Sequence, residues 1–251
     1  MAPMSPPPAP AVPLDHGWAT AAGRRPDNQD RCTATGTWAV VSDGAGGHRG
    51  GALAATLTVD AVAAGLAGAV PAADPGVVHR LVAAADGAVR ARQAADPGVA
   101  TMAATVTVAV AAPGDDWWVG HVGDSPAWRV GGRTITRLTE DHNAAAALVR
   151  AGLITAAEAR AHPGRHMITR AVGAVGRPVA DVSRVTLGPG ERLVLASDGV
   201  SVLGEAAIMD AVLAATTAAS AARRLVAAAV AAGSQDNVTA VVIGRPGGGP
   251  G

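Results

Sequence analysis

Four acidic turns, each at one end of an apolar run, constrain this chain more than any other feature of its 251 residues. The turns are Asp43-Gly44, Gly123-Asp124-Ser125, Ser197-Asp198-Gly199 and Gln235-Asp236-Asn237. The valine-rich runs beside them predict buried β-strands at residues 37–41, 117–122, 192–196 and 238–243. Carboxylates at strand ends can converge on a hard divalent cation such as Mg²⁺ or Mn²⁺. One Asp-Gly pair alone indicates an ordinary turn, so the hypothesis of a metal site rests on the set.

Eight short motifs extend this pattern along nearly the whole chain. In order they are Arg25-Pro26-Asp27-Asn28-Gln29-Asp30, Val41-Ser42-Asp43-Gly44-Ala45-Gly46-Gly47-His48, Met102-Ala103-Ala104-Thr105, Val122-Gly123-Asp124-Ser125, Leu138-Thr139-Glu140-Asp141-His142, Ile168-Thr169-Arg170-Ala171-Val172-Gly173, Ala196-Ser197-Asp198-Gly199 and Asp236-Asn237-Val238-Thr239. No single motif is specific. Their order resembles the metal-dependent protein serine/threonine phosphatases of type 2C, the PPM family, in their compact bacterial form. The resemblance runs from about Gly17 to Arg245.

The coarse order of strands, then helices, then strands predicts an α+β domain. Expected strands cover residues 18–22, 37–42, 105–111, 117–122, 127–130, 134–137, 183–187, 192–196 and 238–244, and expected helices cover 50–67, 76–95, 144–150, 156–161, 205–214 and 218–231. The resemblance implies two stacked antiparallel β-sheets flanked by helices on both outer faces, a four-layer αββα sandwich. We expect this domain at residues 14–245, between a disordered Pro-rich N-terminus at 1–13 and a Gly/Pro tail at 246–251.

The composition agrees with one sizeable domain and argues against two classes of binding partner. The 20 basic and 20 acidic residues cancel, which gives no reason to expect nucleic acid or a membrane surface as a partner. The single cysteine, Cys32, excludes an internal disulfide and fits a reducing cytoplasm. No apolar stretch predicts a membrane span, and the Pro-rich N-terminus at 1–13 does not contain the basic segment typical of a signal peptide. We therefore expect a cytoplasmic monomer.

The resemblance assigns a metal role to five residues. It implies that Asp43 bridges two metal ions, that the Gly44 carbonyl binds one of them, and that Asp198 and Asp236 supply carboxylates to the second. Asp124 matches a residue that helps to hold a third, weaker ion, although an ordinary capped turn is the alternative. The implied cofactors are two Mn²⁺ or Mg²⁺ ions, with a possible third site. Asp198 and Asp236 have their own alternatives, as a turn after one strand and as a connector before the next.

Two further residues take catalytic roles through the resemblance. Arg25 matches an arginine that grips the substrate phosphate with paired donors, which lysine cannot reproduce; a buried pair with Asp30 is the structural alternative. Neighbouring Arg24 reads as a solvated surface charge. Asp30 is expected to orient water around the metal ions without binding them, and an ordinary capped turn is the alternative. Gln29 stands where the family usually has a carboxylate, which lowers the local negative charge.

Other familiar-looking residues are given smaller roles. We expect His48 to cap or pack at the start of a helix and His142 to organise the start of a mobile flap, or simply to begin a helix. Cys32 lacks a motif linking it to a histidine base, so a catalytic thiol is not expected. Ala45 cannot donate a proton to a leaving group. Met102-Ala103-Ala104-Thr105 loses one hydroxyl relative to the usual family motif, and Pro126 replaces a common arginine. None of these departures removes an implied metal ligand.

The sequence therefore predicts a metal-dependent enzyme. It would hydrolyse phosphoserine and phosphothreonine on proteins with a hydroxide held at a two-metal centre, opposing a serine/threonine kinase. One alternative is a phosphatase dedicated to a single regulatory protein in a partner-switching system that controls a sigma factor. Another is a pseudophosphatase that keeps the fold as a binding module.

Overall fold

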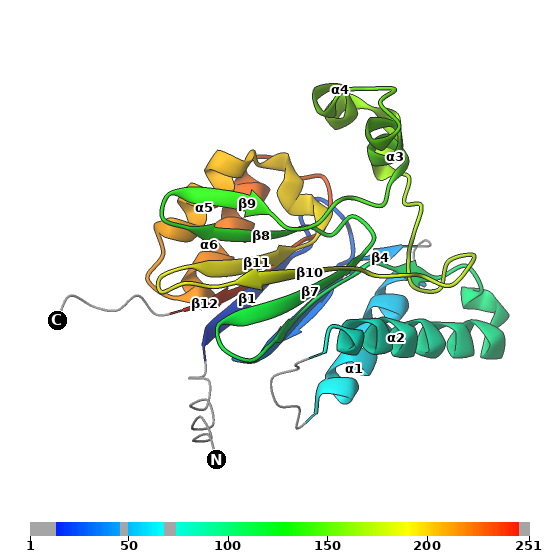
Figure 1. Ribbon diagram of the computed structural model, residues 1–251. Coiled ribbons are helices and arrows are strands. Elements are labelled where there is room, and N and C mark those ends of the chain that lie inside the picture. The colour runs from blue at the N-terminus through cyan, green and yellow to red at the C-terminus, as the bar shows by residue number, and fades with distance from the viewer. Residues whose placement is uncertain (1–13, 46–49, 68–73, 246–251) are drawn as a thin grey trace, which may run out of the picture.

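The computed structural model describes residues 14–45, 50–67 and 74–245. Two five-stranded antiparallel sheets form its centre (Figure 1). The first contains, in spatial order, β1 (Asp15–Ala21), β12 (Val238–Gly244), β11 (Arg192–Ala196), β8 (Ala127–Gly131) and β9 (Thr134–Arg137). The second contains β10 (Asp181–Thr186), β7 (Asp116–Val122), β6 (Val106–Ala111), β3 (Trp38–Ser42) and β2 (Arg31–Ala34).

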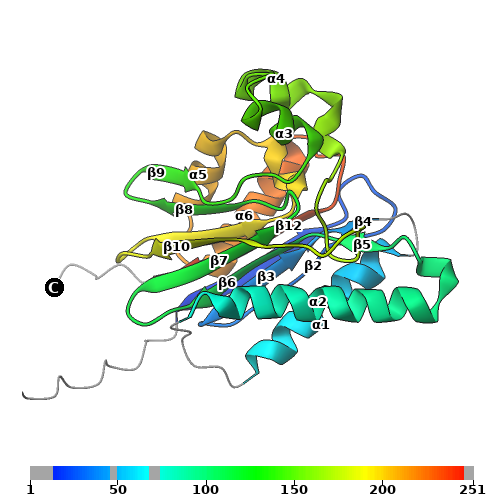
Figure 2. The same cartoon turned by 45° about the vertical axis from the view of Figure 1, so that its right-hand side comes forward.

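Helices cover the outer face of each sheet, as Figures 1 and 2 show. Helices α5 (Glu205–Leu213) and α6 (Ala218–Ala231) pack on the first sheet, and α1 (Gly51–Leu66) and α2 (Gly76–Ala95) pack on the second. The predicted α+β sandwich of four layers is confirmed. None of the helices in the described ranges is both long and apolar enough to span a membrane.

Burial of both sheet faces explains why the strands are continuous apolar runs. In β11, Leu193 and Leu195 point between the sheets, whereas Val194 and Ala196 contact the helical layer. The core between the sheets also contains Trp117 from β7. Side chains alternate between the faces of a strand, so a strand that is covered on both faces needs an apolar residue at every position. This pattern supplies the core of a chain that has neither Phe nor Tyr.

A flap, residues 144–167, projects from the end of the sandwich (Figure 1). It contains α3 (Ala144–Arg150) and α4 (Ala156–Ala161). Asn143 caps α3 by accepting a hydrogen bond from the Ala146 N–H, and a Thr155–Glu158 capping box starts α4. Helix α3 buries only Ala145 and α4 buries no residue, so little apolar burial attaches the flap to the body.

The structure refines several expected boundaries. Strand β1 begins at Asp15 rather than Trp18, and β10 spans Asp181–Thr186 rather than 183–187. Sequence reasoning missed β2 and a two-stranded sheet formed by β4 (Gly44–Ala45) and β5 (Ala103–Ala104). The Pro-rich segment 1–13, the tail 246–251 and His48 lie outside the described residues, so the predictions for them remain predictions.

Candidate active site

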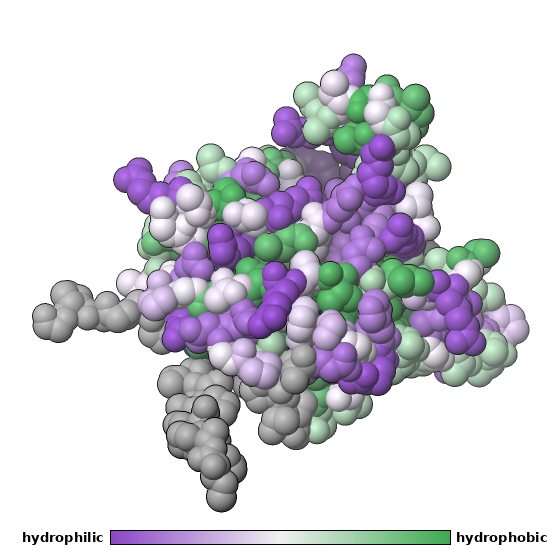
Figure 3. Space-filling model, in the orientation of Figure 1, coloured by the Kyte–Doolittle hydropathy of each residue, from purple (hydrophilic) through white to green (hydrophobic). Residues whose placement is uncertain are grey.

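A cleft of about 1600 Å³ opens at the end of the sandwich below the flap. In Figure 3 the surface is hollowed between the projecting flap and the body. The lining of the cleft includes six of the seven predicted site residues, namely Arg25, Asp43, Gly44, Asp124, Asp198 and Asp236. The seventh, Asp30, is 3% exposed and so lies beneath this surface. The structure thus brings together residues that are up to 211 positions apart in the chain.

Asp43 follows β3 and is held by Thr105. The Asp43 N–H donates to Thr105 Oγ1 at 2.9 Å, and the Thr105 N–H donates to the Asp43 carbonyl at 2.9 Å. Thr105 Oγ1 also lies 2.6 Å from Ser125 Oγ, within the turn that carries Asp124. Thr105 therefore joins two acidic turns.

The turn after Asp43 also needs a glycine. A Cβ on Gly44 would collide with the Gly51 backbone at the start of α1, so close backbone packing requires a glycine there.

Asp30 is buried against the turn that carries Asp198. Its Oδ2 accepts a hydrogen bond from Ser197 Oγ at 2.6 Å, and Ser197 Oγ accepts one from the Thr239 N–H at 3.0 Å. This arrangement places Asp30 behind the cleft rather than on its surface. The expected role of Asp30 in orienting water stays a prediction.

Asp236 lies at the open side of the cleft and pairs with Arg25. Arg25 Nη2 donates to Asp236 Oδ2 at 2.8 Å, and the Arg25 side chain is 56% exposed. The predicted alternative, a buried pair between Arg25 and Asp30, is wrong, because Arg25 is exposed and bonded to Asp236. Asn237 fixes this corner by donating from Nδ2 to the carbonyls of Ala22 and Asp27.

Burial and mutual repulsion raise the pKa values of the carboxyl groups in the cleft. The pKa of Asp43 lies well above its ordinary value because the group is buried and faces Asp30, Asp198 and other carboxylates. Burial and the charge of Asp198 raise the pKa of Asp124 to about 8. Burial and the charge of Asp236 raise the pKa of Asp198 to about 7. The ionised forms of these groups therefore need a compensating positive charge.

The donor atoms fit a hard divalent cation. In the part of the chain that the structure describes, Asp30 Oδ1, Asp124 Oδ1 and Asp198 Oδ1 are buried without a hydrogen-bond partner, a condition that carboxylates rarely tolerate. The same described ranges contain no three carboxylate, imidazole or thiol side chains gathered as a ready-made metal cage. Mg²⁺ and Mn²⁺ suit oxygen ligands, and Mg²⁺ usually binds through one or two carboxylates and keeps several waters. An open carboxylate site suits such ions better than a closed cage.

The chain also matches known proteins over most of its length. Residues 22–238 match the family model described as protein phosphatase 2C. The chain belongs to the protein phosphatase 2C family. It is 33% identical over 227 residues to the serine/threonine protein phosphatase PstP of Mycobacterium tuberculosis, which covers 87% of this chain and 42% of PstP. The chain thus spans about half the length of the curated relatives it matches.

Solved structures of this family share the fold. The PPM Ser-Thr phosphatase MsPP of Mycobacterium smegmatis, in complex with cacodylate, is 36% identical with a TM-score of 0.81, and the match covers 94% of this chain and 100% of MsPP. The catalytic domain of PstP, in complex with two manganese ions, is 29% identical with a TM-score of 0.82, over 92% of this chain and 97% of that domain.

Sequence reasoning missed the carboxylate of Asp141 in the cleft and the residues that hold the acidic turns. Asp141 lines the cleft, where it pairs with Arg137, and its charge raises the pKa values of Asp124 and Asp198. Its position directly after Glu140 in a recognised motif was an available signal. The roles of Thr105 and Asn237 depend on partners far along the chain, and no local pattern shows such partners.

Two further predictions concern Cys32 and His142, which do not line the cleft. Burial raises the pKa of the Cys32 thiol to about 12, which suppresses the thiolate and agrees with a structural cysteine. The residue that caps α3 is Asn143, so the alternative in which His142 begins the helix is wrong by one position. His142 is instead buried, with 1% exposure.

Proposed function

We propose that this chain hydrolyses phosphoserine and phosphothreonine on proteins and that it requires Mn²⁺ or Mg²⁺. The observation that carries the proposal is the convergence of carboxyl groups with raised pKa values and unpaired buried oxygens beside an exposed arginine. The named phosphatase activities of the relatives support the reaction, and the manganese ions in PstP support the choice of cation.

In this proposal Asp43, the Gly44 carbonyl, Asp198 and Asp236 would hold two cations, and Asp124 would contribute to a weaker third site. Bound there, the cations would activate a water molecule and neutralise charge on the phosphate. Asp30, buried behind Ser197, would orient water without touching the ions. The protein's own contribution is a set of rigid strand ends that keep these oxygens in place while they repel one another.

Arg25 would bind the phosphate at the mouth of the cleft. One donor of its guanidinium, Nη2, is bonded to Asp236, and a guanidinium has five N–H donors. Arg25 can therefore stay attached to the carboxylate site and offer a second edge to a phosphate oxygen. The cacodylate bound to MsPP, a tetrahedral oxyanion, is consistent with such a role.

We further propose that the enzyme acts as a monomer in the cytoplasm against a serine/threonine kinase. The free thiol of Cys32 suits a reducing compartment, and the exposed cleft mouth can admit a phosphorylated loop of another protein.

The test is release of inorganic phosphate from a phosphothreonine peptide. Turnover should disappear in excess chelator and return with Mn²⁺. Asp198→Asn and Asp236→Asn should each lower turnover by about 10²–10³-fold or more, by analogy with the loss of one electrostatic group that stabilises a transition state. Asp210→Asn, a change on the exposed side of α5, is the matched control and should retain activity. Normal turnover in either cleft variant at saturating Mn²⁺ would refute the metal assignment, and no turnover in any form would favour a binding module.

A further inference from the structure

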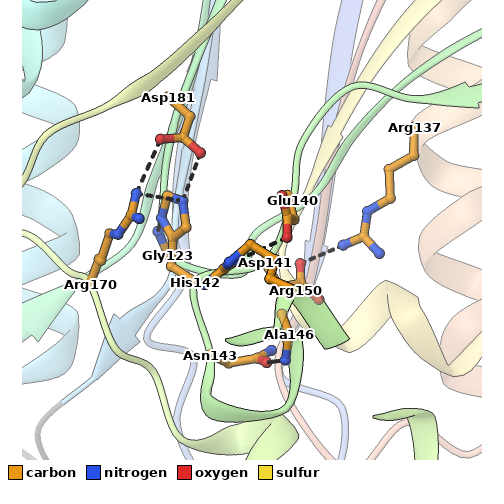
Figure 4. A network of polar contacts seen from close by, with 10 residues as sticks. All are labelled: Gly123, Arg137, Glu140, Asp141, His142, Asn143, Ala146, Arg150, Arg170 and Asp181. Carbon is orange, nitrogen blue, oxygen red and sulfur yellow. Dashed lines mark hydrogen bonds and ion pairs between the residues drawn. The ribbon is translucent and has the colours of Figure 1, made fainter. Parts of the chain in front are cut away.

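A polar network around a buried histidine is not explained by the proposed chemistry (Figure 4). Its centre is His142, which is 1% exposed. Asp181, at the start of β10, and Arg170, on the segment that returns from the flap, lie on one side of the imidazole. Gly123, which precedes Asp124, lies on the other.

His142 holds Gly123 with two hydrogen bonds. The backbone N–H of His142 donates to the Gly123 carbonyl at 2.7 Å, and the backbone N–H of Gly123 donates to the ring nitrogen Nδ1 of His142 at 3.1 Å. Since Nδ1 accepts this bond, the imidazole proton must be on Nε2 when the ring is neutral. His142 Nε2 lies 3.1 Å from Asp181 Oδ2, which accepts a hydrogen bond from the Nε2–H group. Asp181 thereby selects the tautomer that can hold Gly123.

Arg170 keeps Asp181 in place. Its Nη1 donates to Asp181 Oδ1 at 3.1 Å and also lies 3.2 Å from His142 Nε2. Because Nε2 carries the ring proton in the tautomer that holds Gly123, both groups donate to Asp181, each to a different carboxylate oxygen. The Thr169 N–H also donates to the His142 carbonyl at 2.7 Å. The returning segment therefore fixes both the backbone and the ring partner of His142.

The turn that His142 holds determines where the Asp124 carboxylate lies. Gly123 has φ of 114° and packs against Thr105 so closely that a side chain would collide. Within the described residues, Asp124 Oδ1 is buried and has no hydrogen-bond partner. The carboxyl group receives a hydrogen bond from its own backbone N–H, so the backbone of the turn sets its position.

The same returning segment also reaches the Gly44 side of the cleft. Val172 pairs with Ala104 through N–H···O bonds of 2.9 and 3.0 Å, and Ala104 pairs with Gly44 in the β4–β5 sheet. Ile168 forms a bridge with Asn143 at the start of the flap. Residues 168–172 thus join the base of the flap to both acidic turns.

We propose that His142, oriented by Asp181 and Arg170, is a positioning residue that sets the Asp124 turn for the binding of the weakest cation. This inference rests on the proposed function, because it takes Asp124 as a cation ligand. It assigns a role to two motifs, Glu140-Asp141-His142 and Thr169-Arg170, that lie outside the ligand set.

The first measurement uses the metal-free protein and the amide exchange rate of Gly123. His142→Leu should raise this rate by more than about tenfold, because the acceptor is lost. His142→Asn places an amide oxygen near the position of Nδ1 and should restore part of the protection. Asp181→Ala should give an intermediate increase, because the acceptor remains but its tautomer is no longer selected.

The second measurement is a calorimetric titration with Mn²⁺. Asp124→Asn should remove the weakest binding step, and Asp181→Ala should weaken the same step by about 10- to 100-fold, the range seen when groups behind metal ligands are removed. The tighter steps should change by less than about twofold. Arg184→Ala is the matched control, because Arg184 lies on β10 like Asp181 but pairs with Asp116 of β7. It should change neither measurement.

The outcomes separate this inference from the proposed function. Unchanged Gly123 exchange in His142→Leu and Asp181→Ala would overturn the positioning role, as would an unchanged weakest step in Asp181→Ala. If Asp124→Asn left every Mn²⁺ step intact, the inference would fail while the phosphatase proposal stood. If the wild-type protein bound no Mn²⁺, the phosphatase proposal itself would fail.

Discussion

The interior of the sandwich and its acidic end are built by the same strands under opposite conditions. On β11, Leu193 and Leu195 are fully buried among apolar side chains between the sheets. Three residues beyond Leu195, the buried carboxyl group of Asp198 has a pKa raised to about 7 and an oxygen without a partner in the described part of the chain. Apolar burial in the interior stabilises the folded state, whereas the carboxyl groups at the acidic end destabilise it when they are charged. Proteins tolerate such a conflict where function requires it.

The largest effect on stability should come from the interior. Leu195→Ala should lower the free energy of unfolding by about 2–5 kcal/mol, because it removes buried methyl groups and leaves a cavity. Denaturant unfolding monitors this change. Leu153→Ala is the matched control, because Leu153 is 70% exposed, and it should shift the free energy of unfolding by less than about 0.5 kcal/mol. A comparable loss in both variants would contradict the assignment of stability to the interior.

Substitutions at the acidic end should instead lower catalytic activity. Arg25→Ala should lower kcat/KM by roughly 10- to 1000-fold, from the loss of charge-assisted hydrogen bonds of about 1.5–3 kcal/mol together with positioning. Steady-state kinetics on a phosphothreonine peptide measures it. Arg24→Ala, the neighbouring exposed cation, should have a far smaller effect. The phosphate-binding role is excluded by equal losses in the two variants, or by a loss that accompanies unfolding.

A smaller effect should appear in the pH dependence of the metal-free protein. The folded-state pKa values of Asp124 and Asp198, about 8 and about 7, lie above the ordinary value of 3.8. The folded state therefore binds more protons than the unfolded state between these values, and stability must fall as pH rises through about 7–8. Thermal unfolding in chelator should show a lower Tm at pH 8.5 than at pH 7. Above pH 7 the buried His121, whose pKa is lowered to about 3, contributes little. A Tm that rises with pH in this window would contradict the picture of strained carboxylates.

The sequence was sufficient for the parts that depend on local patterns. Alternating burial on two faces produces the valine-rich runs, so β11 and β12 were predicted with their observed bounds. Strand β2 was missed because Arg31-Cys32-Thr33-Ala34 has no such run, and β4 and β5 are only two residues each. The positions of Asp43, Asp198 and Asp236 on one cleft followed from the family resemblance.

The contacts that fix the site depended on tertiary structure. Arg25 meets Asp236 across 211 residues, and no periodicity in the sequence specifies that pair. Asp141 belongs to a recognised motif, but the sequence does not show that its charge reaches Asp124 and Asp198. Thr105 ties two acidic turns together through partners at Asp43 and Ser125, and its own motif does not show them.

The central claim is that the charged carboxyl groups at the acidic end destabilise the folded state until divalent cations bind. The most direct measurement compares the Tm of wild type and Asp198→Asn at pH 8, first in chelator and then in saturating Mn²⁺. Asn removes a buried charge, so the variant should melt at least about 2 °C above wild type in chelator. Wild type should gain more from Mn²⁺, because a ligand at 100 times its Kd adds about 2.7 kcal/mol to the stability of the state that binds it. The order of the two Tm values should therefore reverse on adding Mn²⁺. A variant that melts at or below wild type in chelator, and that gains as much from Mn²⁺, would contradict the account.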